Sequence, residues 1–211
     1  MKSNKFTQKT QFSKFSAGSN FEFFRYKKQK IIILNTNKDP AKIPQDLDGL
    51  ISALSEGERK SYNHLMHAIK FAPSIFESYA SWSETCYTRN CIVDTEKYEL
   101  ILICWYPGHS TPIHDHDGEE CWVKVITGVF KETIYKEKGT GVLQYEKTGV
   151  SKPNEVTYMK DFMGFHTLEN ISNQKSMSLH LYAKPIRKCR VFDAASKIFA
   201  DKKLGYDTRA F

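Results

Sequence analysis

Two histidines separated by one residue, His114 and His116, stand in the middle of the chain. Side chains alternate between the two faces of a β-strand, so a strand here would direct both imidazoles to the same side. Neutral imidazole is a ligand for iron, zinc, copper and nickel. The spacing therefore predicts part of a metal site, held from one wall of a β-structure.

The residues around this pair resemble a signature of the cupins, a family of small-barrel metalloproteins: Gly, five residues, His-x-His, three or four residues, Glu, six residues, Gly. Gly108 and Gly128 match its two glycines. With four intervening residues, the Glu position is held by Cys121. With three, Glu120 holds it, but the interval to Gly128 is then one residue too long. Glu120 would make a mixed nitrogen–oxygen site, whereas Cys121 leaves a site of histidines alone.

A third histidine, His166, begins a His-x-x-x-Asn segment that ends at Asn170 and is similar to the second cupin signature. The Pro-x-Gly that usually precedes this signature is absent. Taken alone, His166 would be read as a hydrogen-bonded core histidine. Because a His-x-His pair lies upstream, we predict that His166 is the third metal ligand.

A later segment, residues 178–182, alternates polar and apolar side chains. As a strand it would place Ser178, His180 and Tyr182 on one face and two leucines on the other. Three buried polar side chains must find hydrogen-bond partners. The row is therefore either a structural network or, beside a metal, a support that positions Tyr182 for proton transfer.

Arg89, in a Tyr-Thr-Arg-Asn sequence that begins at Tyr87, is the remaining candidate. A lone arginine is commonly a solvated surface charge. At the mouth of a barrel, however, a guanidinium can bind a substrate carboxylate through two parallel hydrogen bonds, which lysine cannot do.

The elements that position these residues fall into two groups along the chain, predicted helices first and predicted strands after them. Apolar spacing predicts amphipathic helices over 46–55 and 62–69, and a short third helix over 74–83. An early strand is expected at 31–34. From about residue 85 short apolar runs alternate with turn residues, and strands are predicted at 98–106, 122–126, 129–135, 141–145, 156–159 and 178–182. We expect a mainly β fold: a helical layer (about 46–83) on an antiparallel barrel (about 85–193), as one domain over 31–211.

The net charge of +7 is confined to the front of the chain. Residues 1–30 hold eight Lys or Arg and one acid, Glu22, and the remainder is balanced. We expect residues 1–30 to be a flexible basic terminus; a mitochondrial presequence and a nucleic-acid or membrane-surface arm are the alternatives. No secretory or membrane-spanning run is visible. Five irregularly spaced cysteines indicate reduced thiols and a cytoplasmic protein.

Taken together, these segments resemble the cysteine dioxygenase family over about residues 47–193. The resemblance implies that His114, His116 and His166 bind iron, and that Tyr87 and Arg89 contact the substrate carboxylate. It also implies the remaining roles: a Cys121–Tyr182 thioether crosslink, as in the animal-type enzymes, and support of that tyrosine by Trp105, Ser178 and His180. Thr111 and Pro112 depart from the family pattern, and residues 1–30 match nothing in it.

The resemblance implies one Fe(II) per chain and O2 as co-substrate, with L-cysteine oxidised to cysteine sulfinic acid. Another thiol, such as 3-mercaptopropionate, is an alternative substrate, while Arg89 argues against cysteamine, which lacks a carboxylate. A non-catalytic metal-binding cupin or a sugar isomerase is the alternative class. We expect a monomer with no nucleic-acid or membrane partner.

Overall fold

The computed structural model of the 211-residue chain describes residues 21–25, 31–35 and 43–210. Chain contacts divide the protein into two units, residues 1–43 and 44–211. In the first unit, strand β1 (Phe21–Arg25) pairs antiparallel with β2 (Ile31–Asn35), which confirms the early strand expected at 31–34. Most of the basic terminus, 1–30, lies outside the described residues. The predicted boundary after residue 30 therefore stays a prediction.

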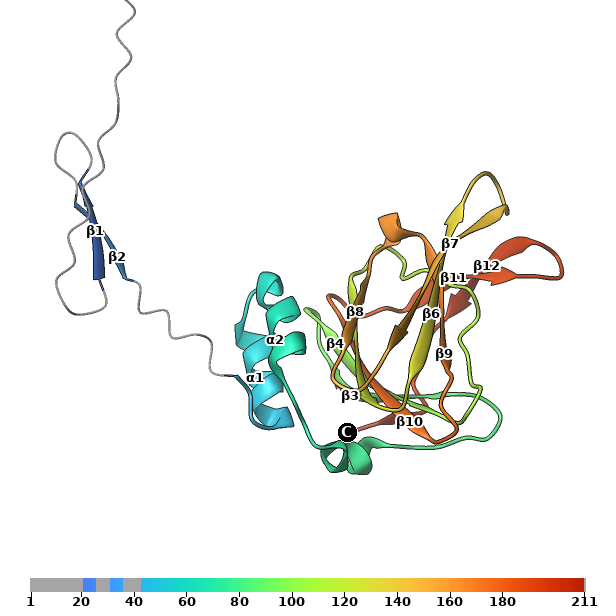
Figure 1. Cartoon of the computed structure of the whole chain (residues 1–211), viewed down its shortest axis with the longest axis horizontal. Helices are drawn as coiled ribbons and strands as arrows, with labels where there is room; N and C mark the ends of the chain where they lie inside the picture. The colour runs from blue at the N-terminus through green and yellow to red at the C-terminus, as the bar shows by residue number, and fades with distance from the viewer. Residues whose placement is uncertain (1–20, 26–30, 36–42, 211) are drawn as a thin grey trace, which may run out of the picture. The chain divides into compact units, whose positions relative to one another are not determined.

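The second unit begins with a helical layer (Figure 1). Helix α1 (Leu47–Glu56) starts at Asp46, whose carboxylate accepts a hydrogen bond from the Gly49 amide at 2.8 Å, a standard N-cap. A 3-10 turn, η1 (Arg59–Ser61), leads into α2 (Tyr62–Ala68). Both predicted helices are confirmed. The third is a seven-residue 3-10 helix, η2 (Pro73–Tyr79), shorter than the predicted 74–83.

A six-stranded sheet lies next to the helices. Its strands, in spatial order, are β13 (Thr208–Arg209), β3 (Thr88–Asp94), β4 (Glu99–Trp105), β10 (Ser176–Tyr182), β5 (Cys121–Thr127) and β8 (Val156–Met159). All neighbours are antiparallel except β13 and β3, which are parallel. Every residue of β4 and β10 is buried, because both faces of the sheet are covered. This explains why their sequences are rich in apolar residues.

A second layer faces this sheet. It consists of β7 (Leu143–Ser151), β6 (Phe130–Glu137) and β9 (Phe165–Asn170), with the short helix η3 (Asp161–Met163) between β8 and β9. The hairpin of β11 (Lys188–Asp193) and β12 (Ile198–Lys203) is joined to it through His114, which forms single bridges to His166 of β9 and Val191 of β11. Two layers therefore enclose the space between them.

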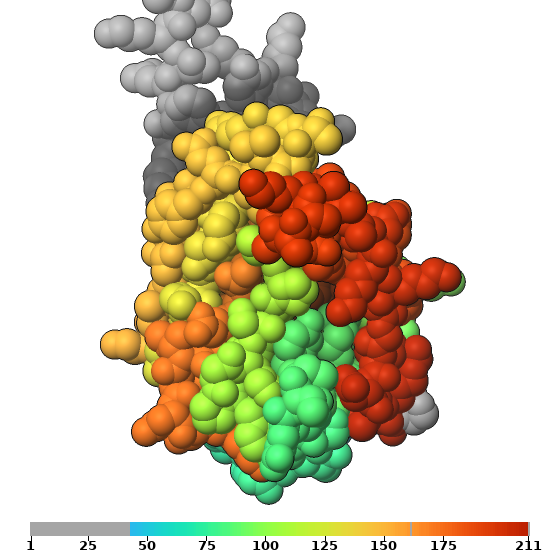
Figure 2. Space-filling view, turned by 90° about the vertical axis from the view of Figure 1, so that its right-hand side faces the viewer, coloured from blue at the N-terminus to red at the C-terminus, as the bar shows by residue number. Residues whose placement is uncertain are grey.

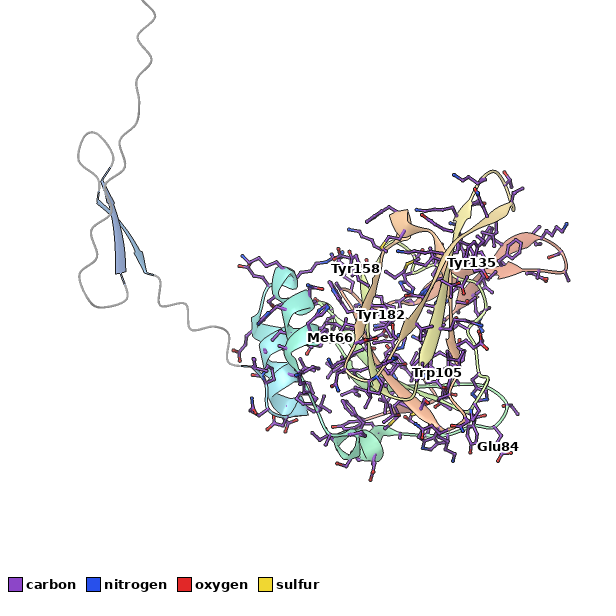
Figure 3. The ribbon with its side chains drawn as sticks, viewed as in Figure 1. Met66, Glu84, Trp105, Tyr135, Tyr158 and Tyr182 are labelled. Carbon is purple, nitrogen blue, oxygen red and sulfur yellow. The ribbon has the colours of Figure 1, made fainter. Side chains whose placement is uncertain are left out.

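Two apolar cores result from the alternation of side chains along the central strands. Leu179 and Leu181 of β10 pack toward the helices in one core, and Tyr182 faces the second layer in the other. Figure 3 shows Met66 on the helical side, and Trp105 and Tyr182 between the two β-layers. The expected alternation of residues 178–182 is thus confirmed.

The mainly β architecture with an N-terminal helical layer is confirmed, and it consists of two facing sheets rather than one closed hydrogen-bonded barrel. Each of the six β-runs predicted beyond residue 85 is a strand. Beyond residue 85, the sequence did not predict β3, β9, β13 or the hairpin of β11 and β12. None of the described helices is both long enough and apolar enough to cross a bilayer.

Candidate metal centre

The His-x-His segment is extended but is not a regular strand, which corrects the expectation from its spacing. His114 pairs with His166 of β9 through two backbone hydrogen bonds. The His114 amide donates to the His166 carbonyl at 3.0 Å, and the His166 amide donates to the His114 carbonyl at 2.9 Å. The intervening Asp115 binds Arg190 through its carboxylate, at 2.8 Å from both the Nε and the backbone amide. The two histidines therefore share the opposite side, as predicted.

Three imidazoles converge in the space between the β-layers. One ring nitrogen of each of His114, His116 and His166 lies within 4.8 Å of the other two. The Nε2 atoms of His116 and His166 are 3.0 Å apart. Two ligands of one metal have about this separation when each bond is about 2.1 Å long. The donor set therefore fits a single metal ion of the kind that imidazole binds.

The surroundings keep two of these rings, those of His114 and His116, in the neutral form that binds metal. Burial lowers the pKa of His114 to about 3 and that of His116 well below its ordinary value, with the neighbouring imidazoles acting in the same direction. The Pro112 carbonyl lies 3.0 Å from Nδ1 of His114, which leaves Nε2 of that ring available. Neutral imidazoles with free lone pairs are therefore present at pH 7.

Glu120, the alternative carboxylate ligand, points away from the histidines. Its carboxylate binds Arg59 at 2.5 Å, the Tyr158 hydroxyl at 2.7 Å and Lys160 at 3.4 Å. These contacts connect the helical layer to β8 and occupy the side chain. Of the two alignments that the sequence left open, the structure supports the one that leaves a site of three histidines.

Cys121 and Tyr182 are direct cross-strand partners on β5 and β10. The thiol and the phenol interact, and burial raises the pKa of each above its ordinary value. The Tyr182 ring also lies 5.4 Å from that of His116, at 85°. Tyr182 therefore stands between the thiol of Cys121 and the three histidines.

The polar row on β10 forms the network expected from its alternation. The Trp105 indole donates to the Ser178 hydroxyl at 2.9 Å, and that hydroxyl lies 2.8 Å from Nε2 of His180. The His180 and Tyr182 rings stack with their centroids 6.3 Å apart. Ser178 and His180 thus support the tyrosine from one side, and Trp105 holds the far end of the row.

Tyr87 and Arg89 line the same pocket as the three histidines and Tyr182. The Tyr87 ring packs on Trp105 at 4.9 Å. The Nη2 atom of Arg89 is buried and has no hydrogen-bond partner in the described part of the chain. Burial alone would lower the pKa of Arg89, but Tyr182, Glu99 and Tyr87 raise it. A permanent positive charge with a free donor therefore faces the histidines.

Comparison with known proteins identifies the group to which this site belongs. The family model for cysteine dioxygenase type I matches residues 42–195, which include all ten predicted site residues. The chain belongs to this family. It is 32% identical to cysteine dioxygenase type 1 of Danio rerio over 169 residues, which cover 71% of this chain and 80% of that protein. It is 34% identical to the human enzyme over 133 residues, covering 61% of this chain and 66% of that protein.

Solved structures resemble the chain more weakly. The Cnp3 cupin domain of Schizosaccharomyces pombe has a TM-score of 0.42 at 11% identity, covering 51% of this chain and 71% of its own. A double-stranded β-helix protein from Klebsiella pneumoniae has a TM-score of 0.41 at 17% identity, covering 51% of this chain and 80% of its own. At this level of similarity neither bears on function. The relatives by sequence establish that this chain is a cysteine dioxygenase enzyme.

Two acidic residues near the centre were not predicted from the sequence. Glu132 of β6 lies 2.6 Å from Nδ1 of His166, on the ring edge opposite the other histidines. Glu99 of β4 is fully buried, receives a hydrogen bond from the Tyr206 hydroxyl and lies 3.4 Å from Nη1 of Arg187. Both lie on strands whose local sequence looks structural. Only the pairing of distant strands brings them to the site.

Glu132→Gln is expected to weaken metal binding by about 10–100-fold, because the carboxylate orients the His166 ring and raises its basicity. Competition between the protein and a chelator for Co(II) measures this. Glu169→Gln, which removes the ion pair with Lys131 at 2.5 Å between two half-buried side chains, is the matched control. Equal affinities of the Glu132 variant and the native chain would contradict the role given to this carboxylate.

Glu99→Gln is expected to change how stability depends on pH. Burial raises the pKa of Glu99 to about 7, so between about pH 4.5 and 7 the folded chain retains a proton that the unfolded chain has released. The native protein therefore loses stability as pH rises through this window, and the amide variant does not. The variant should gain about 1–3 kcal/mol of unfolding free energy over the native chain between about pH 5 and pH 8.

Urea unfolding of both metal-free proteins at the two pH values measures this gain. Glu58→Gln, which changes a carboxylate whose side chain is 74% exposed, is the control and should show no such trend. A constant difference between the Glu99 variant and the native chain would show that this carboxyl ionises normally.

Proposed function

We propose that this chain oxidises the thiol of L-cysteine with O2 to cysteine sulfinic acid, at an Fe(II) ion bound by His114, His116 and His166. One observation carries the proposal: three converging histidines share a pocket with Arg89, whose buried Nη2 has no hydrogen-bond partner among the described residues. The cysteine dioxygenase relatives support the same reaction. The proposal includes a monomeric enzyme in the cytoplasm, consistent with five unpaired cysteines.

His114, His116 and His166 would hold Fe(II) through their ring nitrogens, and the bound ion would supply open positions for O2 and for a thiolate. Arg89 would bind the carboxylate of the substrate through paired hydrogen bonds. A cysteine molecule so held has its sulfur directed toward the histidines and its carboxylate toward β3. The substrate itself supplies the four electrons that O2 takes up, so no reductant is required, and oxidation stops at the sulfinic acid.

Tyr182 would act as a hydrogen-bond donor in this pocket. Burial raises the pKa of its hydroxyl well above the ordinary value, so the phenol remains protonated at pH 7. A protonated phenol can donate to the developing charge on sulfur or oxygen without adding a negative charge. Tyr87 would complete the carboxylate site beside Arg89. Apolar side chains exclude water from the remaining wall: Ile103, Leu168, Ile186, Val191 and Leu204.

Oxygen uptake by the Fe(II)-loaded protein with L-cysteine, 3-mercaptopropionate and cysteamine tests the proposal. We expect one O2 per sulfinate formed from L-cysteine, read by product mass in the same samples. Arg89→Ala should raise the KM for L-cysteine by about 10–100-fold, because a charge-assisted hydrogen bond contributes about 1.5–3 kcal/mol. Arg59→Ala, which removes a half-exposed arginine near the helices, is the control.

The outcomes separate the alternatives. Turnover of 3-mercaptopropionate in preference to L-cysteine would show that the substrate is a different thiol, and the proposed metal site would stand. An unchanged KM in the Arg89 variant would show that Arg89 does not bind the substrate carboxylate. Binding of iron without oxygen uptake for any of the three thiols would indicate a metal-binding protein without this activity.

We also propose that Cys121 and Tyr182 become joined by a thioether. The bond would form between the sulfur and a ring carbon beside the hydroxyl, with loss of the S–H and C–H hydrogens as two protons and two electrons that O2 accepts. After turnover, intact-mass measurement should show a species lighter by two hydrogen atoms. Cys121→Gly should lack it and retain part of the activity, whereas Cys189→Ser, at another buried cysteine, should still form it. An unchanged mass in the native chain after many turnovers would contradict the crosslink.

A further inference from the structure

The C-terminal segment, residues 204–209, is part of the pocket although it lies beyond the residues that match the family model. Its last two residues form β13, the parallel edge strand that pairs with β3 at Thr208 and Asn90. Leu204 at its start lines the pocket. Figure 2 shows the red C-terminal part of the chain lying beside green residues of the middle of the chain. The segment therefore runs beside the strand that carries Arg89.

Three hydrogen bonds connect this segment to Arg89. The Arg89 amide donates to the Asp207 carboxylate at 2.7 Å, and the Asp207 amide donates to the Arg89 carbonyl at 2.8 Å. The Nε atom of Arg89 donates to the Gly205 carbonyl at 3.1 Å. The same six residues therefore hold the backbone of Arg89 and the inner end of its guanidinium. Its buried Nη2 has no hydrogen-bond partner among the residues that the structure describes.

The segment is itself anchored on both sides of Asp207. The Tyr206 hydroxyl donates to the buried carboxylate of Glu99 and accepts a hydrogen bond from Arg187 at 2.8 Å. The Leu204 amide donates to the Arg187 carbonyl at 2.9 Å. On the other side the Thr208 hydroxyl donates to Asn90 at 2.8 Å. A fixed segment, rather than a loose tail, thus contacts Arg89.

We propose that residues 204–209 position Arg89 for recognition of the substrate carboxylate, with Asp207 and Gly205 as its contacts and Tyr206 as its anchor. In this arrangement the segment determines how strongly the enzyme prefers thiols that carry a carboxylate. The inference rests on the proposed function, because it assigns Arg89 to that carboxylate. Asp207 is a positioning residue: it holds the backbone of Arg89 and does not line the pocket.

The physical basis is preorganisation. An arginine side chain has several rotatable bonds and loses their freedom when its guanidinium forms a paired contact with a carboxylate. Here the backbone and Nε are fixed before the substrate arrives. Without Asp207 the side chain would have to be ordered on binding, and the affinity for a carboxylate would fall. A ligand that lacks a carboxylate would not be affected.

Anaerobic calorimetric titration of the Fe(II)-loaded, full-length protein with L-cysteine and with cysteamine tests this. Asp207→Ala should weaken L-cysteine binding about tenfold and leave cysteamine binding within about twofold of the native value. Asp207→Asn, which keeps an acceptor oxygen, should restore most of the L-cysteine affinity. Asp201→Ala is the matched control, because it removes an exposed carboxylate of β12 that pairs with Lys188 at 3.8 Å. It should change neither affinity.

A double-mutant cycle completes the test. In the Arg89→Ala background, Asp207→Ala should have no further effect on L-cysteine binding, since residues that act through one another are not additive. An unchanged L-cysteine affinity in Asp207→Ala would overturn the proposal. So would an equal loss for both ligands, which indicates a general disturbance of the pocket. Failure of the proposed function would appear separately, as native protein that binds L-cysteine without consuming O2.

Discussion

The backbone pairing between His114 and His166 is the contact on which the site depends. Its two hydrogen bonds join the His-x-His segment to β9, and the same residue bridges to β11. Without this pairing, nothing would align the two histidines of one segment with a third histidine about fifty residues away along the chain. With it, the three imidazoles face one another within 4.8 Å. The rest of the second layer serves to hold that register.

Burial then determines the chemistry that these side chains can perform. The space between the β-layers keeps imidazoles neutral, a phenol protonated and a thiol un-ionised, because water is largely excluded from it. The two acidic side chains discussed near this space each have a specific hydrogen-bond partner. Glu132 touches His166, and Glu99 receives the Tyr206 hydroxyl. The pocket thus places the buried guanidinium of Arg89 beside three converging histidines.

The two ends of the described second unit have different relations to this pocket. The helical layer packs on the outer face of the six-stranded sheet, and its Arg59 also binds Glu120, just before β5. The C-terminal segment contacts the pocket directly, through Arg89 and Leu204.

The sequence by itself determined which residue types are available and how short segments alternate. The His-x-His spacing, the row Ser178, His180 and Tyr182, and two of the three helices follow from local periodicity, which any fold would respect. It could not place Glu132, Glu99 or Asp207, because their partners lie 34 or more residues away and depend on strand register. Tertiary structure alone decided that Glu120 turns toward Arg59 and that Arg89 faces the histidines, since both outcomes depend on long-range packing rather than on local pattern.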